Sequence, residues 1–256
     1  METVRNKEGF QTHINDNDRQ TLTRIIELLG PLVNLEPIDR YSSMSANEVW
    51  LTLVVQVCVM GSARHIERLT SDTDRYKDFE KKVALSTVAS QQNPDIYLTD
   101  VLQNFSVTRF HKKSAERLVK VLRSSNTFQG DKVLLLEGLS HKADAIQTRD
   151  ELIQRCPIFG LKSASDFMIS IGLSHDVIAL DTRVIGILQK YFDYKLTLGE
   201  VQSNRRCYLS LEAGLREVCQ EKRVSLALLD RLLFNFSNVN VIELLVKYPE
   251  FIDCLR

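Results

Sequence analysis

Apolar side chains recur at intervals of three and four residues along most of the chain, and few segments alternate with a period of two. The first pattern is typical of helices that bury one face, whereas the second would indicate half-buried strands. We therefore predict an all-α fold. The expected helices are Asn17–Leu29, Ser45–Leu69, Asp78–Gln91, Ile96–Asn104, Lys112–Ser124, Lys132–Leu139, Lys142–Cys156, Lys162–Ile171, Asp181–Tyr191, Leu198–Gln220 with a break, Ser225–Ser237 and Val239–Cys254.

Several helix ends carry recognisable signals. Ser45 and Glu48 have the spacing of a capping box, in which each side chain binds the other residue's backbone N–H. Gly172 is placed to stop the helix that begins at Lys162. Asp181 is placed as the N-cap of a helix whose apolar residues share one face.

Composition limits the class of protein. With 256 residues, of which 44% are hydrophobic, the chain can bury a core large enough for one large domain or two closely packed lobes. It contains no run of about 18 apolar residues, and its N-terminus has no apolar signal region. We expect no membrane association and a cytoplasmic or nucleoid location, or a nuclear one in a eukaryote.

The 5 cysteines are scattered and form no Cys-x-x-Cys pair. Neither a zinc site nor a disulfide framework is therefore expected. The formal net charge is zero, but Arg109–Arg123 carries six basic residues against one glutamate. Such a run is either a solvated helix face or a strip that contacts phosphates.

Lys162 is an unusual residue for a helix N-terminus. The positive end of the helix dipole raises the free energy of an ammonium group there and favours the neutral amine, which is a nucleophile. The helix rises about 15 Å over roughly 10 residues, and the following segment can span roughly 25 Å if it is extended. That segment can return Asp181 to the level of Lys162. The alternatives are a solvated lysine and an ordinary aspartate cap.

The residues around Lys162 and Asp181 resemble a known signature. The segments Cys156-Pro157-Ile158-Phe159-Gly160-Leu161-Lys162 and Leu180-Asp181-Thr182-Arg183-Val184 are similar to the Leu-Pro-Gly-x-Gly-x-Lys hairpin and the catalytic aspartate of the helix-hairpin-helix DNA glycosylases. Two positions depart from the signature. Ile158 replaces the first hairpin glycine, although a β-branched residue avoids positive φ, and Arg183 stands where a histidine is common.

The resemblance extends over about Ser45 to Asn238. Gln56–Arg64 resembles the family segment that fills the gap left by an extruded base, and Thr108–Leu118 resembles a basic stretch of the 8-oxoguanine branch. Leu228–Phe234 resembles a helix of the archaeal 8-oxoguanine glycosylases. The four-cysteine iron-sulfur loop of endonuclease III is missing from this sequence, which favours the 8-oxoguanine branch.

The resemblance implies a helix-hairpin-helix glycosylase fold with two helical lobes and the active site in the cleft between them. Residues 1–256 would form a single two-lobed unit. Within it, residues of about 45–140 would form a lobe with the duplex-probing segment, about 141–195 the hairpin and catalytic segment, and about 196–256 the helices that complete the other lobe.

The resemblance also implies a bifunctional DNA glycosylase and abasic-site lyase that removes an oxidised purine, with 8-oxoguanine favoured. Lys162 would attack C1′ of the deoxyribose and form a Schiff base, and Asp181 would stabilise the developing positive charge. The partner would be duplex DNA with a damaged base or an abasic site, bound by a monomer. No metal and no cofactor are expected.

Further contact residues follow from the same resemblance. The DNA-binding residues would be Phe159, Gly160, Lys112, Lys113, Arg117 and Arg183, the base pocket would contain Phe234, Asp230 and Gln56, and the duplex-probing residues would be Met60 and Arg64. Phe234 has a core aromatic as its alternative. For the whole chain, the alternatives are a non-catalytic helix-hairpin-helix module that grips DNA and an all-α protein-interaction scaffold.

Overall fold

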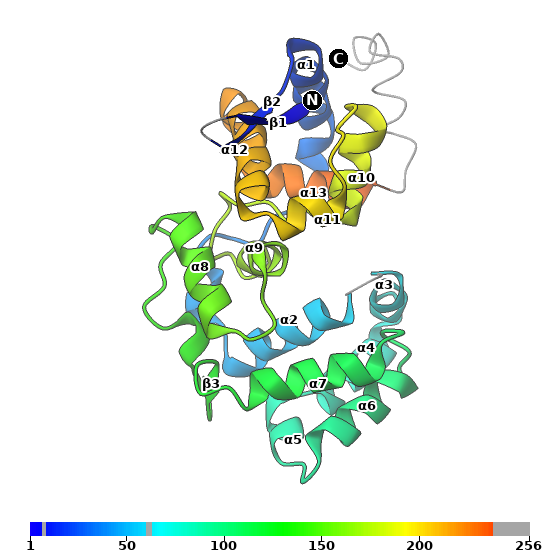
Figure 1. Cartoon of the computed structure of the whole chain (residues 1–256). Helices are drawn as coiled ribbons and strands as arrows, with labels where there is room; N and C mark the ends of the chain where they lie inside the picture. Colours follow the sequence, from blue (N-terminus) through cyan, green and yellow to red (C-terminus); the bar gives the residue numbers. More distant parts are fainter. Residues whose placement is uncertain (7–8, 60–62, 238–256) are drawn as a thin grey trace. The chain divides into compact units, whose positions relative to one another are not determined.

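The structure, a computed structural model, describes residues 1–6, 9–59 and 63–237, and is mainly helical (Figure 1). The prediction of an all-α fold is confirmed in its main content, because the described strands are short and form only two-stranded sheets. In chain order the elements are β1 (Glu2–Asn6), β2 (Gly9–His13), α1 (Asp16–Leu29), η1 (Gly30–Leu32), η2 (Arg40–Ser43), α2 (Ala46–Cys58), α3 (Arg64–Thr70), α4 (Thr73–Lys82), α5 (Leu85–Ala89), α6 (Pro94–Asn104), α7 (His111–Leu122), β3 (Phe128–Gln129), β4 (Lys132–Val133), η3 (Leu134–Leu136), α8 (Ala145–Arg155), α9 (Leu161–Ser170), α10 (Thr182–Tyr191), α11 (Leu198–Ser203), α12 (Arg205–Glu221) and α13 (Leu226–Phe236).

The chain forms two compact units. Unit 1 consists of Met1–Pro37 and Ser174–Arg256, and unit 2 consists of Ile38–Leu173. The N-terminal segment thus joins the C-terminal helices in one unit, and unit 2 is a single uninterrupted stretch. The functional ranges expected from the sequence within a two-lobed unit stay a prediction.

Unit 1 is organised around α12, which contacts β2, α1, α11 and α13. A Cβ atom at Gly214 of α12 would lie 3.3 Å from Thr12 Cγ2, so this glycine allows the β1–β2 hairpin to pack closely on the helix. The Thr12 hydroxyl also lies 3.0 Å from that of Ser210. α10 packs on α13 and completes the apolar interior of the unit.

Unit 2 is organised around α2, which contacts α5, α7 and α9. The predicted capping box opens this helix: Ser45 Oγ accepts from Glu48 N (3.2 Å), and Glu48 Oε2 accepts from Ser45 N (2.8 Å). The hydrogen bonds that the Glu48 carboxylate accepts from Ser45 N and from Ser45 Oγ (2.7 Å) lower the pKa of Glu48. α8 packs on α9, and the hairpin between these two helices carries the residues discussed below.

Most of the expected helices are confirmed to within a few residues, namely those that correspond to α1, α6, α7, α8, α9, α10, α11 with α12, and α13. The break expected between Leu198 and Gln220 lies at Asn204, which caps α12 by accepting hydrogen bonds from Arg206 N and Cys207 N. The helix expected at Val239–Cys254 lies outside the described residues.

Two expected helices are wrong as single elements. The helix predicted over Ser45–Leu69 is divided into α2 and α3, with the poor helix formers Gly61 and Ser62 in the interval. The helix predicted over Asp78–Gln91 is divided into α4 and α5. Two side chains of α2 bind the backbone at this second break, because Trp50 Nε1 donates to Val83 O (2.7 Å) and Asn47 Oδ1 accepts from Leu85 N (2.9 Å).

Neither of the two small sheets was predicted from the sequence. The helix predicted over Lys132–Leu139 is wrong: β4 pairs with β3 across a two-residue Gly130–Asp131 loop, and Gly130 takes the positive φ of 58° that such a turn requires. The β1–β2 hairpin pairs Glu2 with His13 through Asn6 with Gly9 and is held by its contact with α12. Among the described residues, no helix is long and apolar enough to cross a membrane.

Candidate active site

The hairpin between α8 and α9 is formed without the left-handed conformation that Ile158 would avoid. The non-glycine residues with positive φ in the described part of the chain do not include Ile158. Phe159 N donates to Cys156 O (3.2 Å), and Gly160 N donates to Ser163 Oγ (2.9 Å). The Phe159 ring is buried, with its centroid 5.1 Å from that of Phe167. Any DNA contact of Phe159 is therefore expected from its backbone.

Neither the backbone conformation nor the packing at position 160 requires a glycine. Its φ of −121° and ψ of −175° are extended, and a Cβ atom there would meet nothing within 4 Å. The first hydrogen bond of α9 runs from Ala164 N to Gly160 O (2.9 Å). The N–H groups of the preceding helical residues therefore lie at the helix N-terminus, which is a ready-made anion site.

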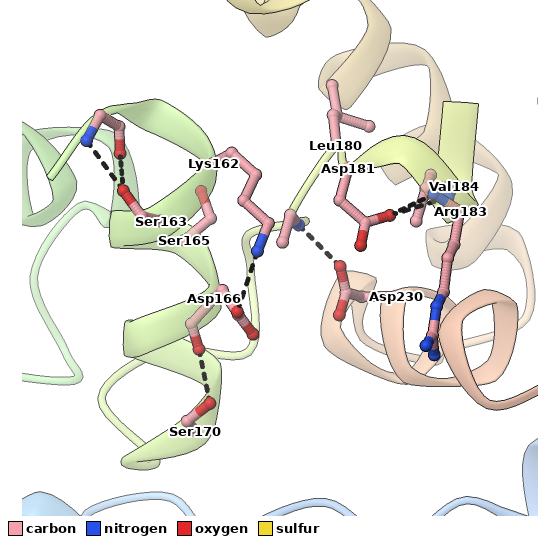
Figure 2. Close-up of polar contacts among 12 residues, drawn as sticks. Lys162, Ser163, Ser165, Asp166, Ser170, Leu180, Asp181, Arg183, Val184 and Asp230 are labelled. Carbon is pink, nitrogen blue, oxygen red and sulfur yellow. Dashed lines mark hydrogen bonds and ion pairs between the residues drawn. The ribbon is translucent and has the colours of Figure 1, made fainter. Parts of the chain in front are cut away.

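Lys162 lies in the first turn of α9, as predicted, and forms an ion pair within this helix. Its Nζ lies 3.1 Å from Asp166 Oδ2 one turn later (Figure 2). The Lys162 side chain is 28% exposed and that of Asp166 is 16% exposed, so both groups are partly accessible to a ligand. The expectation based on the helix dipole alone omitted this counter-charge, although the spacing of i, i+4 can be read directly from the sequence.

A buried arginine fixes the first turn of α9. Arg149 of α8 is fully buried, and its Nη1 donates to Ser165 Oγ (3.0 Å). The Ser165 hydroxyl in turn donates to Leu161 O (2.8 Å), the carbonyl next to Lys162. At the other end of the helix, Gly172 has a φ of 66° and is the predicted stop. The helix that carries Lys162 is thus fixed at both ends.

Asp181 is the N-cap of α10, which confirms the predicted cap. Its Oδ1 accepts from Arg183 N and from Val184 N, both at 2.9 Å (Figure 2). The carboxylate is half-buried, and it lies where the α10 dipole favours a negative charge. Asp181 belongs to unit 1 and Lys162 to unit 2, and each is described within its own unit. The meeting of these two residues stays a prediction.

Arg183 and Phe234 form a pair within unit 1. The Arg183 guanidinium lies over the Phe234 ring at 4.0 Å from the centroid, and Arg183 Nη1 lies 3.5 Å from Phe234 O. The Phe234 side chain is half-buried, in contrast to the buried aromatics of the core. The role of Phe234 as a stacking platform for a base stays a prediction.

Asp230 has backbone and cationic partners that the base-pocket prediction did not anticipate. It is 1% exposed, its Oδ1 accepts from Ala179 N (2.7 Å, Figure 2), and its Oδ2 lies 3.2 Å from Arg231 Nη1. Gln56 likewise binds the backbone of α9, because its amide donates to Ser163 O (3.3 Å) and accepts from Phe167 N (2.7 Å). These partners give both residues a role within the protein, and their contacts with a base stay predictions.

The remaining predicted contacts are surface residues or lie outside the described part. Lys112, Lys113 and Arg117 are exposed on α7, whose opposite face is buried in unit 2. Arg64 is exposed at the first residue of α3, and Met60 lies outside the described residues. In the described part of the chain, no group of three or more His, Cys, Asp or Glu residues could hold a metal ion.

Sequence reasoning missed a set of buried polar residues on α12. Tyr208 and Glu212 are both fully buried and bind the backbone just before Asp181. Their i, i+4 spacing places them beside Leu211 and Leu215 on the apolar face of this helix. A glutamate on an apolar helix face was the available signal, since a buried charge requires a partner.

Comparisons with known proteins agree with the fold. Residues 70–224 match the family model described as "Ogg-HhH: 8-oxoguanine DNA glycosylase", a range that contains both Lys162 and Asp181. A search of curated proteins finds no match.

Several solved structures share the fold. One is the Thermotoga maritima 8-oxoguanine DNA glycosylase, with 21% identity and a TM-score of 0.58, covering 86% of this chain and 95% of that chain. Another is the Methanocaldococcus jannaschii 8-oxoguanine DNA glycosylase, with 19% identity and a TM-score of 0.59, covering 86% and 93%. A third is the Methanocaldococcus jannaschii 8-oxoguanine glycosylase/lyase in complex with a 15mer DNA containing 8-oxoguanine, with 19% identity and a TM-score of 0.56, covering 86% and 90%.

Proposed function

The chain belongs to the 8-oxoguanine DNA glycosylase family, and from this membership we propose that it excises 8-oxoguanine from duplex DNA and then nicks the strand as an abasic-site lyase. The observation that carries the proposal is Lys162, an accessible lysine at the N-terminus of α9 directly after the hairpin. A monofunctional glycosylase needs an aspartate that activates water, but it needs no lysine at this position.

The proposed reaction begins with attack of Lys162 Nζ on C1′ of an extruded nucleotide. The bond from C1′ to the base breaks, and the base leaves with the bonding electron pair. Opening of the sugar ring gives a Schiff base, from which loss of a C2′ proton expels the 3′ phosphate. Asp166, 3.1 Å from Nζ, is placed to accept a proton from the lysine. Asp181 stabilises the positive charge that develops on the sugar.

DNA binding in this proposal relies on two features of unit 2. The open space at Gly160 and the N–H groups at the start of α9 accommodate a phosphate without any side-chain charge. The exposed basic residues of α7 supply the salt-dependent part of the affinity. Zero net charge over the whole chain is compatible with this arrangement, because the local charge faces the phosphates.

Borohydride reduction in the presence of a duplex with one abasic site tests the proposal. The protein should become covalently attached to the DNA, and Lys162→Gln should abolish both this attachment and strand nicking while DNA binding persists. Lys142→Gln is the matched control, because Lys142 is another exposed lysine of unit 2. The Lys142→Gln variant should become covalently attached to the DNA to the same extent as the unaltered protein.

The other outcomes separate the alternatives. Attachment that survives Lys162→Gln would place the nucleophile on another amine. Binding of the duplex without any attachment would indicate a non-catalytic helix-hairpin-helix module, and the absence of binding would indicate a protein-interaction scaffold. A second assay, release of 8-oxoguanine from a duplex that contains it, tests the base separately from the lyase chemistry.

A further inference from the structure

The backbone that leads into Asp181 is buried and non-helical, yet it belongs to no sheet in the described part of the chain. Ile178 and Leu180 are fully buried and Ala179 is 4% exposed. The described strands, β1 to β4, do not include these residues. Buried N–H and C=O groups require hydrogen-bond partners. The partners of this segment must therefore come from side chains.

Three buried acidic or hydroxyl side chains take the place of a neighbouring strand. Glu212 Oε1 accepts from Ile178 N (3.2 Å), and Asp230 Oδ1 accepts from Ala179 N (2.7 Å). The Tyr208 hydroxyl accepts from Leu180 N (3.2 Å) and donates to Ile178 O (2.6 Å). The three side chains belong to unit 1: Tyr208 and Glu212 lie on α12, and Asp230 lies on α13.

This arrangement fixes the register of the segment. Each N–H group in a run of three residues has its own acceptor, so a slip by one residue would break the whole set. Apolar side chains of similar size could fill the same space without the free-energy cost of burying polar groups. Asp181 is the next residue, so the register of this segment determines the position of the Asp181 carboxylate.

We propose that Tyr208, together with Glu212 and Asp230, positions the Asp181 carboxylate for base excision and acts on the reaction only through Asp181. The inference rests on the proposed role of Asp181 in the glycosylase reaction. Tyr208 is a positioning residue in this account, because its hydroxyl binds the backbone of Ile178 and Leu180.

Tyr208→Phe is the principal test, because it removes the hydroxyl and keeps the ring. The single-turnover rate of 8-oxoguanine release from a duplex should fall about 10- to 100-fold, as for a catalytic group displaced by a fraction of an ångström. The Kd for a duplex with an abasic site should stay within about threefold of its original value, since the residue does not contact DNA.

Tyr194→Phe is the matched control. Tyr194 is also buried in unit 1, and its hydroxyl lies 3.2 Å from Thr3 Oγ1. Its loss should lower the melting temperature to a similar extent and leave the rate unchanged. Equal loss of rate in the two variants would overturn the proposal, because it would indicate general destabilisation.

A double-mutant cycle with Asp181→Asn supplies a readout that a purely structural role would not move. In the Asp181→Asn background, Tyr208→Phe should slow the reaction no further. Additional slowing there, or an unchanged rate in Tyr208→Phe alone, would overturn the proposal. An unchanged rate in Asp181→Asn would instead refute the proposed function of Asp181, so the two failures are distinguishable.

Gln202→Met provides a second variant that does not depend on a buried position. Gln202 is exposed on α11, and its Nε2 donates to Leu180 O (2.8 Å), the carbonyl that precedes Asp181. Loss of this donor should slow base release by a smaller factor of about 3 to 10, and again only while Asp181 is present. If Tyr208→Phe does not fold, an unchanged rate in Gln202→Met overturns the proposal.

Discussion

Asp181 combines a structural and a proposed chemical role in one carboxylate. As an N-cap, it accepts two backbone hydrogen bonds from the first turn of α10. Asn caps helices about as well as Asp, but it carries no charge. We therefore expect Asp181→Asn to lower the rate of base release by two or more orders of magnitude, or about 2.7 kcal/mol of barrier, with little change in melting temperature. Single-turnover kinetics and thermal unfolding measure the two effects.

Asp144→Asn is the control for this prediction. Asp144 is also an aspartate N-cap, and it accepts from Gln147 N (2.8 Å) at the start of α8. The same chemical change there should leave both the rate and the melting temperature nearly unaltered. A normal rate in Asp181→Asn would reduce Asp181 to a cap and remove the electrostatic partner from the mechanism.

At the residue scale, the sequence predicts those features that depend on residues close by in the chain. The cap at Asp181 and the stop at Gly172 involve residues within one helical turn, so both can be read locally. The acceptor for Ala179 N is Asp230, 51 positions later, and the acceptors on α12 are also distant in sequence. No local pattern indicates which buried carboxylate will meet which backbone group.

Helix α7 should carry most of the salt dependence of DNA binding. Lys112, Lys113 and Arg117 are exposed on it, while its apolar residues are buried in unit 2. Replacing these three residues by Ala should reduce the slope of log K against log salt by up to about 3, roughly one for each lost phosphate contact. Fluorescence anisotropy with a labelled duplex over a salt series measures this slope.

A triple variant of α4 separates the local effect from the total charge. Lys77, Lys81 and Lys82 are exposed lysines of the same unit, and their replacement by Ala removes the same three charges. The slope should then stay close to its original value. Equal flattening in both triple variants would show that binding depends on the overall charge of the unit and that α7 has no special part in it.

At the scale of elements, the helices with local start and stop signals could be predicted, and their interruptions could not. The capping box at Ser45 is confirmed atom by atom. The break between α4 and α5 depends on Trp50, whose indole binds a carbonyl 33 positions away. The Gly130–Asp131 pair was a readable hairpin signal that the helical pattern around it concealed.

At the scale of the molecule, buried cysteines report on the integrity of each unit. Burial raises the pKa of Cys58 and of Cys219 to about 12 and that of Cys156 to about 11, and it also raises the pKa of Cys207. At pH 8 these thiols should therefore be almost entirely protonated and shielded. With Cys254 replaced by Ser, the native protein should take up almost no iodoacetamide, and the unfolded protein should be alkylated at all four sites.

The sites also distinguish the two units, because Cys58 and Cys156 lie in unit 2 whereas Cys207 and Cys219 lie in unit 1. Peptide mass spectrometry over a denaturant series assigns each alkylation to its unit. Rapid alkylation of any of these residues without denaturant would contradict the burial that the structure describes.

The overall class of the molecule could be predicted from the sequence, but the packing of the first residues on the C-terminal helices could not. Helical periodicity and the lysine hairpin indicated an all-α glycosylase, and the fold and the family are as expected. The joining of the first 37 residues to the C-terminal helices depends on packing between Thr12 and Gly214, which are about 200 positions apart. Periodicity carries no information about such pairings.

Because unit 1 is discontinuous in sequence, the two units can complete their folding at different times during synthesis. All residues of unit 2 are available for contact once Leu173 has left the exit tunnel. The β1–β2 hairpin is synthesised before α12, but it packs on α12, which ends at Glu221. At 5 to 20 residues per second, the hairpin waits roughly 10 to 40 seconds for that partner, and a two-stranded hairpin alone is marginally stable in water. The hairpin residues, which are synthesised well before α12, are therefore among the last to reach their native surroundings.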